Sequence, residues 1–256
     1  MARRKRKSAS YIPWILIAAV FLLGAFLVTR NWWQQRLASR VQYKEFGISI
    51  PANYAIHGID VSRYQQHINW QLVKAMNVAG VKINFAFIKA TEGNGDADLY
   101  FGRNWRKAKE AGMIRGAYHF FIASKDGTAQ ARNFISKVKL QAGDLPPVLD
   151  VEQTYGVSKQ VLQQRVKAWL YATELAFGVQ PIIYTNVDFY KKYLAGEFDN
   201  YPLWAAHYLQ PNEPRINRNW HFWQHSEKGK VSGIVANVDF NVFNGDSTEF
   251  AGFLLK

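Results

Sequence analysis

The 256-residue chain contains no cysteine. This absence excludes disulfide bonds, thiolate metal sites and cysteine nucleophiles. It leaves the redox compartment open, because a chain without cysteine tolerates either side of a membrane.

Acidic residues are missing from the first 40 positions, which carry eight lysines and arginines. The formal net charge is +13, but the remaining residues hold 24 basic and 19 acidic side chains, an excess of only +5. The folded part is therefore only mildly basic, and its charge gives no reason to predict nucleic acid as a partner.

Low-complexity segments and fixed-period repeats are also absent, and charge is absent from one long stretch, "YIPWILIAAVFLLGAFLV" at 11–28. Eighteen residues come close to the length that spans a bilayer. The basic run "RRKRK" precedes the stretch, Trp14 lies near its start, and Trp32 and Trp33 follow its end, as in an interfacial aromatic belt. The sequence that follows, "LVTRNWWQQR", is a poor signal-peptidase site.

These features predict a basic cytoplasmic tail at 1–10, an uncleaved transmembrane signal-anchor at 11–28, and a linker at 29–55. Because basic residues stay on the cytoplasmic side, a domain at 56–256 would lie outside the cytoplasm, on the periplasmic or cell-wall side. The predicted localisation is thus the cytoplasmic membrane, with a single pass and the lipid bilayer as a partner of residues 11–28.

From residue 56 onward, strand-like runs alternate with helix-like segments. Five strands are expected at 57–62, 83–91, 115–121, 145–152 and 181–186, with helices at 69–80, 100–112, 127–140 and 158–178 between them. Three further strand-like runs follow at 202–208, 221–226 and 238–243. Such alternation predicts parallel pairing, and eight strands predict a closed α/β barrel whose last part is irregular.

Barrel enzymes carry their chemistry at the carboxyl ends of the strands. The side chains expected there are mainly acids and aromatics: Asp60, Lys89, Glu92, Tyr118, His119, Asp150, Glu152, Tyr184, Asn186, Trp204, Tyr208, Gln224, His225 and Asp239. They would converge on one rim.

Asp150 and Glu152 in "PPVLDVEQTYG" are separated by Val151 alone. Residues i and i+2 of a strand face the same side, so both carboxylates would enter the barrel mouth while Val151 faces outward. Two close carboxylates repel, and the more desolvated one should hold a proton. Glycoside hydrolysis uses one acid and one charged carboxylate in this way. Ion pairs with lysine or arginine, or a divalent metal completed by Asp60 and Asp239, are alternatives.

Eight motifs carry a more specific signal: "GIDVSRYQ", "FAFIKATEG", "GAYHFF", "PPVLDVE", "IIYTN", "LWAAHY", "FWQHS" and "VDFNVF". In order and spacing they resemble the glycoside hydrolase family 25 lysozymes, over about residues 56–245. The resemblance implies an irregular, TIM-like β/α barrel, with about five βα units and a partly antiparallel closing section.

The implied activity is that of a muramidase, which cleaves the β-1,4 bond between N-acetylmuramic acid and N-acetylglucosamine in peptidoglycan. The glycan strands would be the partner, and neither a cofactor nor a metal is implied. Glu152 matches the general acid and Asp150 its assisting neighbour, with Asp60 as a third catalytic acid. The positions that match substrate-binding residues are Asp239, Tyr118, Tyr184, Trp204, Tyr208 and Gln224.

Two other functions remain open at this point. A chitinase-like hydrolase would carry a longer acidic run, DxxDxDxE, whereas residues 145–152 read "LPPVLDVE". A non-catalytic tether between membrane and wall would fit the anchor and the aromatics, although the four intact acids argue against it.

Overall fold

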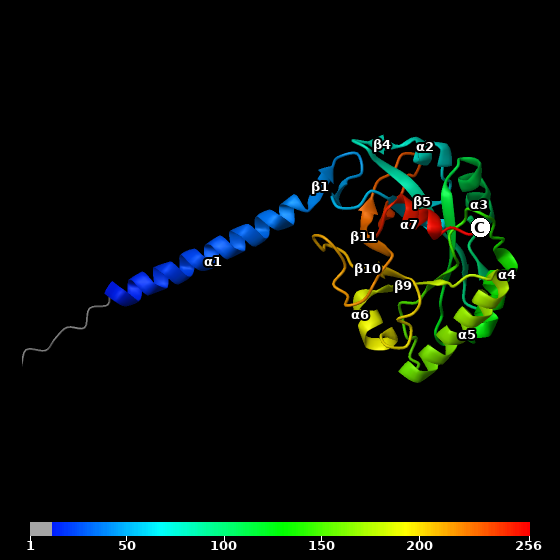
Figure 1. Cartoon of the computed structure of the whole chain (residues 1–256). Coiled ribbons are helices and arrows are strands. Elements are labelled where there is room, and N and C mark those ends of the chain that lie inside the picture. The colour runs from blue at the N-terminus through cyan, green and yellow to red at the C-terminus, as the bar shows by residue number, and fades with distance from the viewer. Residues whose placement is uncertain (1–11) are drawn as a thin grey trace, which may run out of the picture.

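The computed structural model describes residues 12–256, and Figure 1 shows a long helix that projects from a globular body. This helix, α1 (Ile12–Ala38), leaves many apolar side chains exposed, among them Trp14, Phe21 and Val28. In the part of the chain that the structure describes, no helix combines the length and apolarity needed to cross a bilayer. The predicted transmembrane span at 11–28 is therefore not supported, and its first residue and the tail at 1–10 lie outside the described residues.

A hairpin follows α1 and belongs to the folded body. Its strands, β1 (Arg40–Tyr43) and β2 (Ile48–Pro51), pair antiparallel. Phe46, Ile48 and Ile50 are buried in the main hydrophobic cluster. Residues 40–51, which lie within the stretch predicted as a linker at 29–55, thus pack against the barrel.

Eight strands close into a barrel, as predicted. Around the barrel they follow the order β3 (His57–Val61), β5 (Val81–Glu92), β7 (Ile114–Phe120), β8 (Val148–Asp150), β9 (Ile182–Asn186), β10 (Leu203–Ala206), β11 (Phe222–Gly229) and β12 (Val238–Phe243). Neighbours from β3 to β11 run parallel, whereas β12 is antiparallel to both β11 and β3. The closing section is therefore partly antiparallel, which confirms that prediction.

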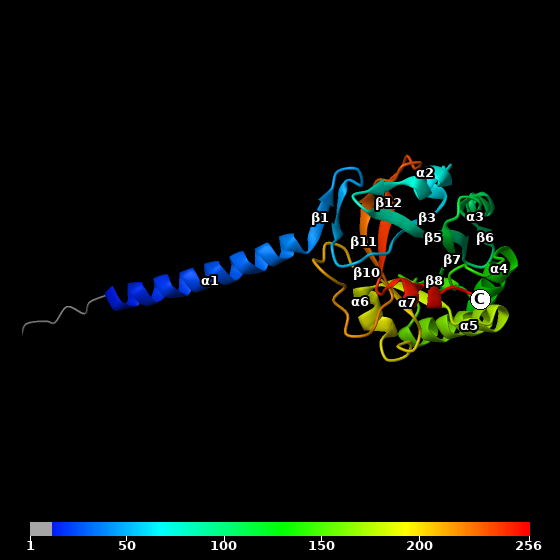
Figure 2. The same ribbon diagram turned by 45° about the horizontal axis from the view of Figure 1, so that its top comes forward.

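The connections between strands, and the segment after β12, supply helices and short elements around the barrel, as Figures 1 and 2 show. They are η1 (Arg63–Gln65), α2 (Trp70–Ala75), β4 (Asn77–Val78), β6 (Asp96–Ala97), α3 (Phe101–Glu110), α4 (Gly127–Lys137), α5 (Lys159–Phe177), α6 (Val187–Phe189), the π-helix η2 (Tyr190–Leu194) and α7 (Ser247–Gly252). Helix α5 ends as predicted at Gly178, whose φ of 66° is the left-handed conformation that glycine favours.

The predicted helix at 69–80 is shorter than expected, because its second half forms a hairpin. Val78 of β4 pairs with Val81 of β5. The two residues between them, Ala79 and Gly80, both have positive φ, 48° and 91°, the pattern of a tight two-residue turn. The "NVAG" sequence thus turns the chain directly into the next barrel strand.

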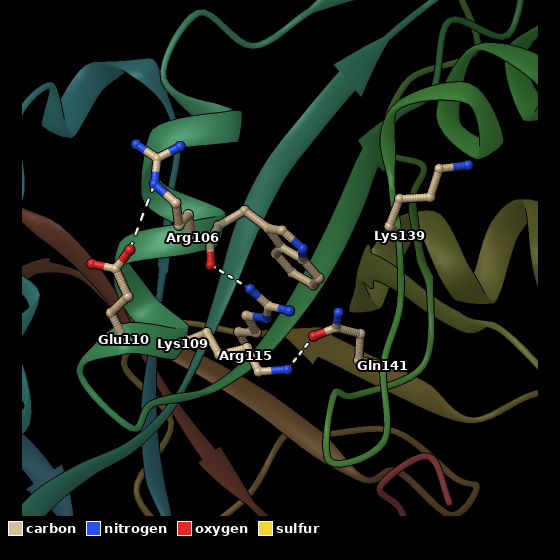
Figure 3. A pocket seen from close by; sticks show the side chains of 7 residues that line it. Arg106, Lys109, Glu110, Arg115, Lys139 and Gln141 are labelled. Atoms are coloured by element: carbon tan, nitrogen blue, oxygen red, sulfur yellow. Dashed lines mark hydrogen bonds and ion pairs between the residues drawn. The ribbon is translucent and has the colours of Figure 1, made fainter.

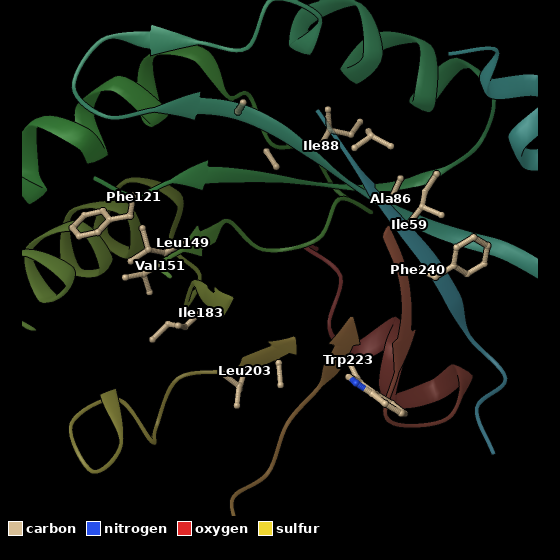
Figure 4. Packing of buried hydrophobic residues seen from close by; sticks show 14 of the residues in the cluster. Ile59, Ala86, Ile88, Phe121, Leu149, Val151, Ile183, Leu203, Trp223 and Phe240 are labelled. Atoms are coloured by element: carbon tan, nitrogen blue, oxygen red, sulfur yellow. The ribbon is translucent and has the colours of Figure 1, made fainter. Parts of the chain in front are cut away.

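Alternate side chains along each strand divide the core into two layers. Outward-facing residues such as Leu149, Ile183 and Trp223 belong to the outer hydrophobic cluster, part of which Figure 4 shows. Inward-facing rings, including Phe85, Phe87 and Phe222, fill the barrel interior. Side chains alternate along a strand with a period of two. Burial of the outward-facing residues therefore fixes which polar side chains face inward and reach the mouth.

Candidate active site

Asp150 and Glu152 enter the barrel mouth together, because Val151 faces the other way. Asp150 is the last residue of β8, and the Val151 amide donates to the Tyr184 carbonyl at 3.0 Å, which continues the ladder by one residue. The Val151 side chain is buried in the outer cluster. The predicted orientation of the pair is therefore confirmed.

Asp239 reaches the same mouth by another route. Strand β12 runs against its neighbours, so its start rather than its end lies at the mouth. Asp239 and Asp60 are opposite partners in the register of β12 and β3. The antiparallel closing strand thus delivers a carboxylate beside the one that ends β3.

A pocket of about 300 Å³ lies over these carboxylates. All nine predicted site residues line it: Asp60, Tyr118, Asp150, Glu152, Tyr184, Trp204, Tyr208, Gln224 and Asp239. Ser62, Tyr64, Lys89, Phe120 and Glu227 complete its wall. The structure therefore brings every predicted residue to one place, whereas their individual roles stay predictions.

Asp60 is held by two side-chain amides. The Nδ2 of Asn241 and the Nε2 of Gln224 donate to its Oδ2, at 2.7 and 2.9 Å. The Gln224 Oε1 accepts from the hydroxyls of Tyr184 and Tyr208, at 2.8 and 2.6 Å. Because this carbonyl oxygen faces two hydroxyl donors, the amide nitrogen of Gln224 is directed at Asp60.

Trp204 fixes Asn241 in the same way, because its indole Nε1 donates to Asn241 Oδ1 at 2.7 Å. An indole N–H can only donate, so the amide nitrogen of Asn241 must face Asp60. Trp204 itself is only 2% exposed and stacks on Phe87 with centroids 4.4 Å apart. It therefore forms the floor of the pocket more than a platform for a ligand.

Asn241 is a site residue that the sequence prediction missed. It lies two residues after Asp239 on β12, so the strand period places both on the inner face. That spacing could have identified it, but an asparagine beside apolar residues carries no catalytic signal of its own.

Asp60 and Asp239 are neighbouring carboxyls whose pKa values are both raised. Burial raises the pKa of Asp60, and the donors Asn241 and Gln224 partly offset this rise. Burial, followed by the charge of Asp60, raises the pKa of Asp239 to about 9. Since the amides already stabilise the charge on Asp60, the proton resides on Asp239 near neutral pH.

Asp150 and Glu152 form a second such pair. Burial first and the charge of Glu152 second hold the pKa of Asp150 well above its ordinary value. Burial also raises the pKa of Glu152, but the hydrogen bond with Asp150 lowers it again. In the free protein the shared proton therefore lies on Asp150, the more buried partner, although Glu152 is the predicted proton donor.

Lys89 lies in the pocket wall and forms an ion pair with Glu92, the last residue of the same strand, β5. Its Nζ contacts Glu92 Oε2 at 2.7 Å, and its charge lowers the pKa of Asp150. Glu92 does not line the pocket, so its part is to hold Lys89 beside the carboxylates. Within residues 12–256, no group of three or more His, Asp or Glu side chains is arranged to hold a metal ion.

His119 and His225 lie outside the pocket. His119 is buried between Thr91 and Gln130, with its Nδ1 2.7 Å from Thr91 Oγ1, and burial lowers its pKa to about 3. Burial also lowers the pKa of His225, whose Nδ1 faces Arg40 at 3.1 Å. Both histidines are neutral and structural.

A larger hollow of about 480 Å³ lies near the start of β7, at the end of the barrel away from the carboxylates (Figure 3). Its one acid, Glu110, binds Lys107 at 2.6 Å and Arg106 at 3.6 Å. Without a pair of facing carboxylates, this hollow lacks the acid–base arrangement of the mouth.

Comparisons with known proteins agree with this geometry. A family model for glycosyl hydrolases family 25 matches residues 59–234. YegX, an uncharacterized protein of Escherichia coli O6:H1 (strain CFT073), is 50% identical over 211 residues, which cover 82% of this chain and 78% of YegX. Lysozyme M1 of Streptomyces globisporus is 35% identical over 207 residues, 75% of this chain and 69% of that enzyme. A solved family 25 glycosyl hydrolase from Bacillus anthracis matches with a TM-score of 0.74 and 30% identity, and the match covers 84% of this chain and 100% of that one.

Proposed function

Because the chain belongs to glycosyl hydrolases family 25 and is a glycoside hydrolase of the lysozyme type, we propose that it cleaves the β-1,4 bond between N-acetylmuramic acid and N-acetylglucosamine in peptidoglycan. One observation carries the proposal: two carboxyl pairs, Asp150 with Glu152 and Asp60 with Asp239, meet in one pocket. Burial and the charge of the partner carboxylate raise the pKa of Asp150 and of Asp239 there. Hydrolysis of a glycosidic bond requires both a proton and negative charge at such a place.

Glu152 is the proposed proton donor to the leaving oxygen. It is less buried than Asp150 and stands at the pocket surface, where a glycan strand would lie. Asp150 Oδ1 is buried and has no hydrogen-bond partner among the described residues. An N–H of the bound sugar that reached this oxygen would stabilise the Asp150 carboxylate, and the shared proton would then pass to Glu152.

Asp150, once ionised, has two roles open to it. It would hold the acetamido group of the substrate for attack on the sugar carbon, or stabilise the positive charge that develops there. Asp60 adds a second negative charge, which the amides of Gln224 and Asn241 keep in place. Preorganised charge of this kind stabilises an oxocarbenium-like transition state without a cost of reorganisation.

The test uses the full-length chain in detergent with purified peptidoglycan and, in parallel, chitin. Soluble fragments are expected from peptidoglycan alone, and Glu152→Gln should bind the polymer without releasing fragments. Release from chitin alone would favour the chitinase-like alternative. Binding by the wild type without release at any pH would favour the non-catalytic tether and contradict the proposal.

We also propose that residues 11–28 attach the enzyme to a lipid bilayer, with the barrel outside the cytoplasm. The support is the exposure of apolar side chains along α1, such as Phe21 at 76% and Val20 at 70%, together with the basic run ahead of it. Membrane flotation of the expressed chain, and of a variant without residues 1–28, tests this. Recovery of both in the unbound fraction would contradict the attachment.

A further inference from the structure

The segment between α1 and β3 contacts the loop that joins β10 to β11, residues 207–221, here called the β10–β11 loop. In Figures 1 and 2 this loop, drawn in yellow to orange, reaches toward the base of β1. Two side chains make the contact. Arg40 Nη1 donates to the Gln210 carbonyl at 2.7 Å, and the Tyr54 hydroxyl donates to the Asn212 carbonyl at 2.9 Å.

Arg40 is well placed to hold the loop, because its other contacts are with the domain itself. Its Nη2 donates to the Ser49 carbonyl at 2.5 Å and to His225 Nδ1 at 3.1 Å. The guanidinium also lies 5.9 Å from the centroid of Trp223. A planar group with several fixed donors joins the hairpin, the barrel and the loop at one point.

Tyr54 is fixed by aromatic packing. Its ring centroid lies 5.8 Å from that of Trp220 and 6.0 Å from that of Trp223. The ring thus already packs on the loop at Trp220, and the hydroxyl adds a hydrogen bond to Asn212.

The second residue of the loop, Tyr208, belongs to the pocket. Tyr208 lines the site and donates to Gln224 Oε1, the amide that holds Asp60. The next residue, Leu209, is 86% exposed and has a φ of 58°, a left-handed conformation that disfavours a leucine. Such a conformation persists only where its neighbours hold it. The Gln210 carbonyl, bound by Arg40, lies one residue further on.

We propose that Arg40 and Tyr54 are positioning residues that hold the β10–β11 loop and, through the bend at Leu209, set Tyr208 against Gln224 in the pocket. The match to the family model begins at residue 59, so both residues lie in a segment outside it. The segment that follows α1 therefore does not line the pocket itself, but it contacts the loop that carries the pocket residue Tyr208. The expected change in KM rests on the proposed function, whereas the expected positioning of the loop does not.

Tyr54→Phe removes one hydroxyl and leaves the aromatic packing. Tyr43→Phe is the matched control, because Tyr43 lies in the same segment and packs on Phe46 without a hydrogen bond to the loop. We expect Tyr54→Phe to raise KM for peptidoglycan fragments about threefold to tenfold, the value of one hydrogen bond, with a smaller change in kcat. Tyr43→Phe should change neither.

A double variant shows whether the effect passes through the pocket residue. Tyr208→Phe breaks the bond to Gln224, so adding Tyr54→Phe to it should cause little further loss. Fully additive effects of the two substitutions would overturn the inference.

Amide hydrogen exchange of the full-length chain gives a readout that does not need activity. The amides of Arg215 and Ile216 in the loop donate to His207 Nδ1 and to the Pro214 carbonyl, and their exchange should become several-fold faster in Tyr54→Phe and stay unchanged in Tyr43→Phe. Equal exchange in both would overturn the inference even if the enzyme is active. A wild type without activity but with the expected exchange would contradict the proposed function and leave the positioning role supported.

Discussion

The two ends of the barrel treat a buried aspartate in opposite ways. Near the start of β7, Asp144 accepts from Nε and Nη2 of Arg115 at 2.8 and 3.1 Å, and this guanidinium stacks 3.8 Å from the Trp105 centroid. At the mouth, Asp150 faces Glu152, and the pKa of each is raised. The same residue type is thus structural where a buried cation pairs with it, and holds a proton where another carboxyl faces it.

This difference indicates where the molecule gives up stability for chemistry. Crowded carboxyls at the mouth oppose folding near neutral pH, because they would be free to ionise in the unfolded chain. Active sites commonly carry such a cost. Substitutions at the mouth should therefore reduce activity, and substitutions near the start of β7 should reduce stability.

The largest effect is expected for Glu152→Gln, which removes the proposed proton donor and keeps the shape of the side chain. The rate of fragment release should fall by about 10²–10⁴-fold, the usual contribution of a general acid. The matched control is Glu92→Gln, the other glutamate at a strand end, which should lose less than about tenfold. An equal loss in both variants would show that charge, not proton donation, is what matters.

Asp144→Ala should be the most destabilising change, since it leaves Arg115 buried without its partner. Breaking a buried pair costs about 3–5 kcal/mol, which for a domain of this size corresponds to a fall in Tm of about 10 °C. Calorimetry measures it, with Glu110→Ala as a control in which an exposed ion pair is lost and Tm hardly changes. A Tm that is unchanged in Asp144→Ala would refute the structural role of this pair.

Asp239→Asn should alter how stability depends on pH. The folded pKa of Asp239 is about 9, above that of an unfolded aspartate, so the proton stabilises the fold at low pH. This contribution is lost as pH rises toward 9. Asparagine can donate to Asp60 at every pH, so the variant should be more stable than the wild type at pH 8, by on the order of 2 kcal/mol, and not at pH 4.

Chemical unfolding at a series of pH values tests this, with the exposed Asp96→Asn as the control. A gain of stability that is the same at pH 4 and pH 8 would contradict the shared proton between Asp239 and Asp60.

A smaller effect is expected for Trp204→Phe, which keeps an aromatic ring against Phe87 but removes the donor to Asn241. Without that donor the Asn241 amide can turn its oxygen toward Asp60, and kcat/KM should fall about tenfold, the value of one such bond. Trp169→Phe is the matched control, because the Trp169 Nε1 is buried without a partner among the described residues. Similar activity losses in both variants would indicate a general packing defect.

The sequence predicted most of the barrel because its strands are both apolar and separated by helices or glycines. The four acids could be found since Asp60, Asp150 and Glu152 follow apolar runs, and Asp239 lies in one. Asp239 was expected at the carboxyl end of a parallel strand, and this was wrong, because β12 is antiparallel and Asp239 lies near its start. The direction of a strand depends on pairing partners that are distant in sequence.

Other features could not be predicted for physical reasons. The hairpin at 40–51 is held by the burial of Phe46 and Ile50 against the barrel, a tertiary effect that short strands do not signal. The π-helix at 190–194 has no sequence pattern of its own. The direction of the Gln224 and Asn241 amides depends on Tyr184 and Trp204, which only the closed barrel brings near them.

The most direct test of the central claim is mass analysis of the products of a peptidoglycan digest by the full-length chain. If Glu152 and Asp150 carry muramidase chemistry, the soluble fragments should have muramic acid at their reducing ends, and none should form with Glu152→Gln. Fragments that end in reducing N-acetylglucosamine, or equal release by the variant, would contradict the account.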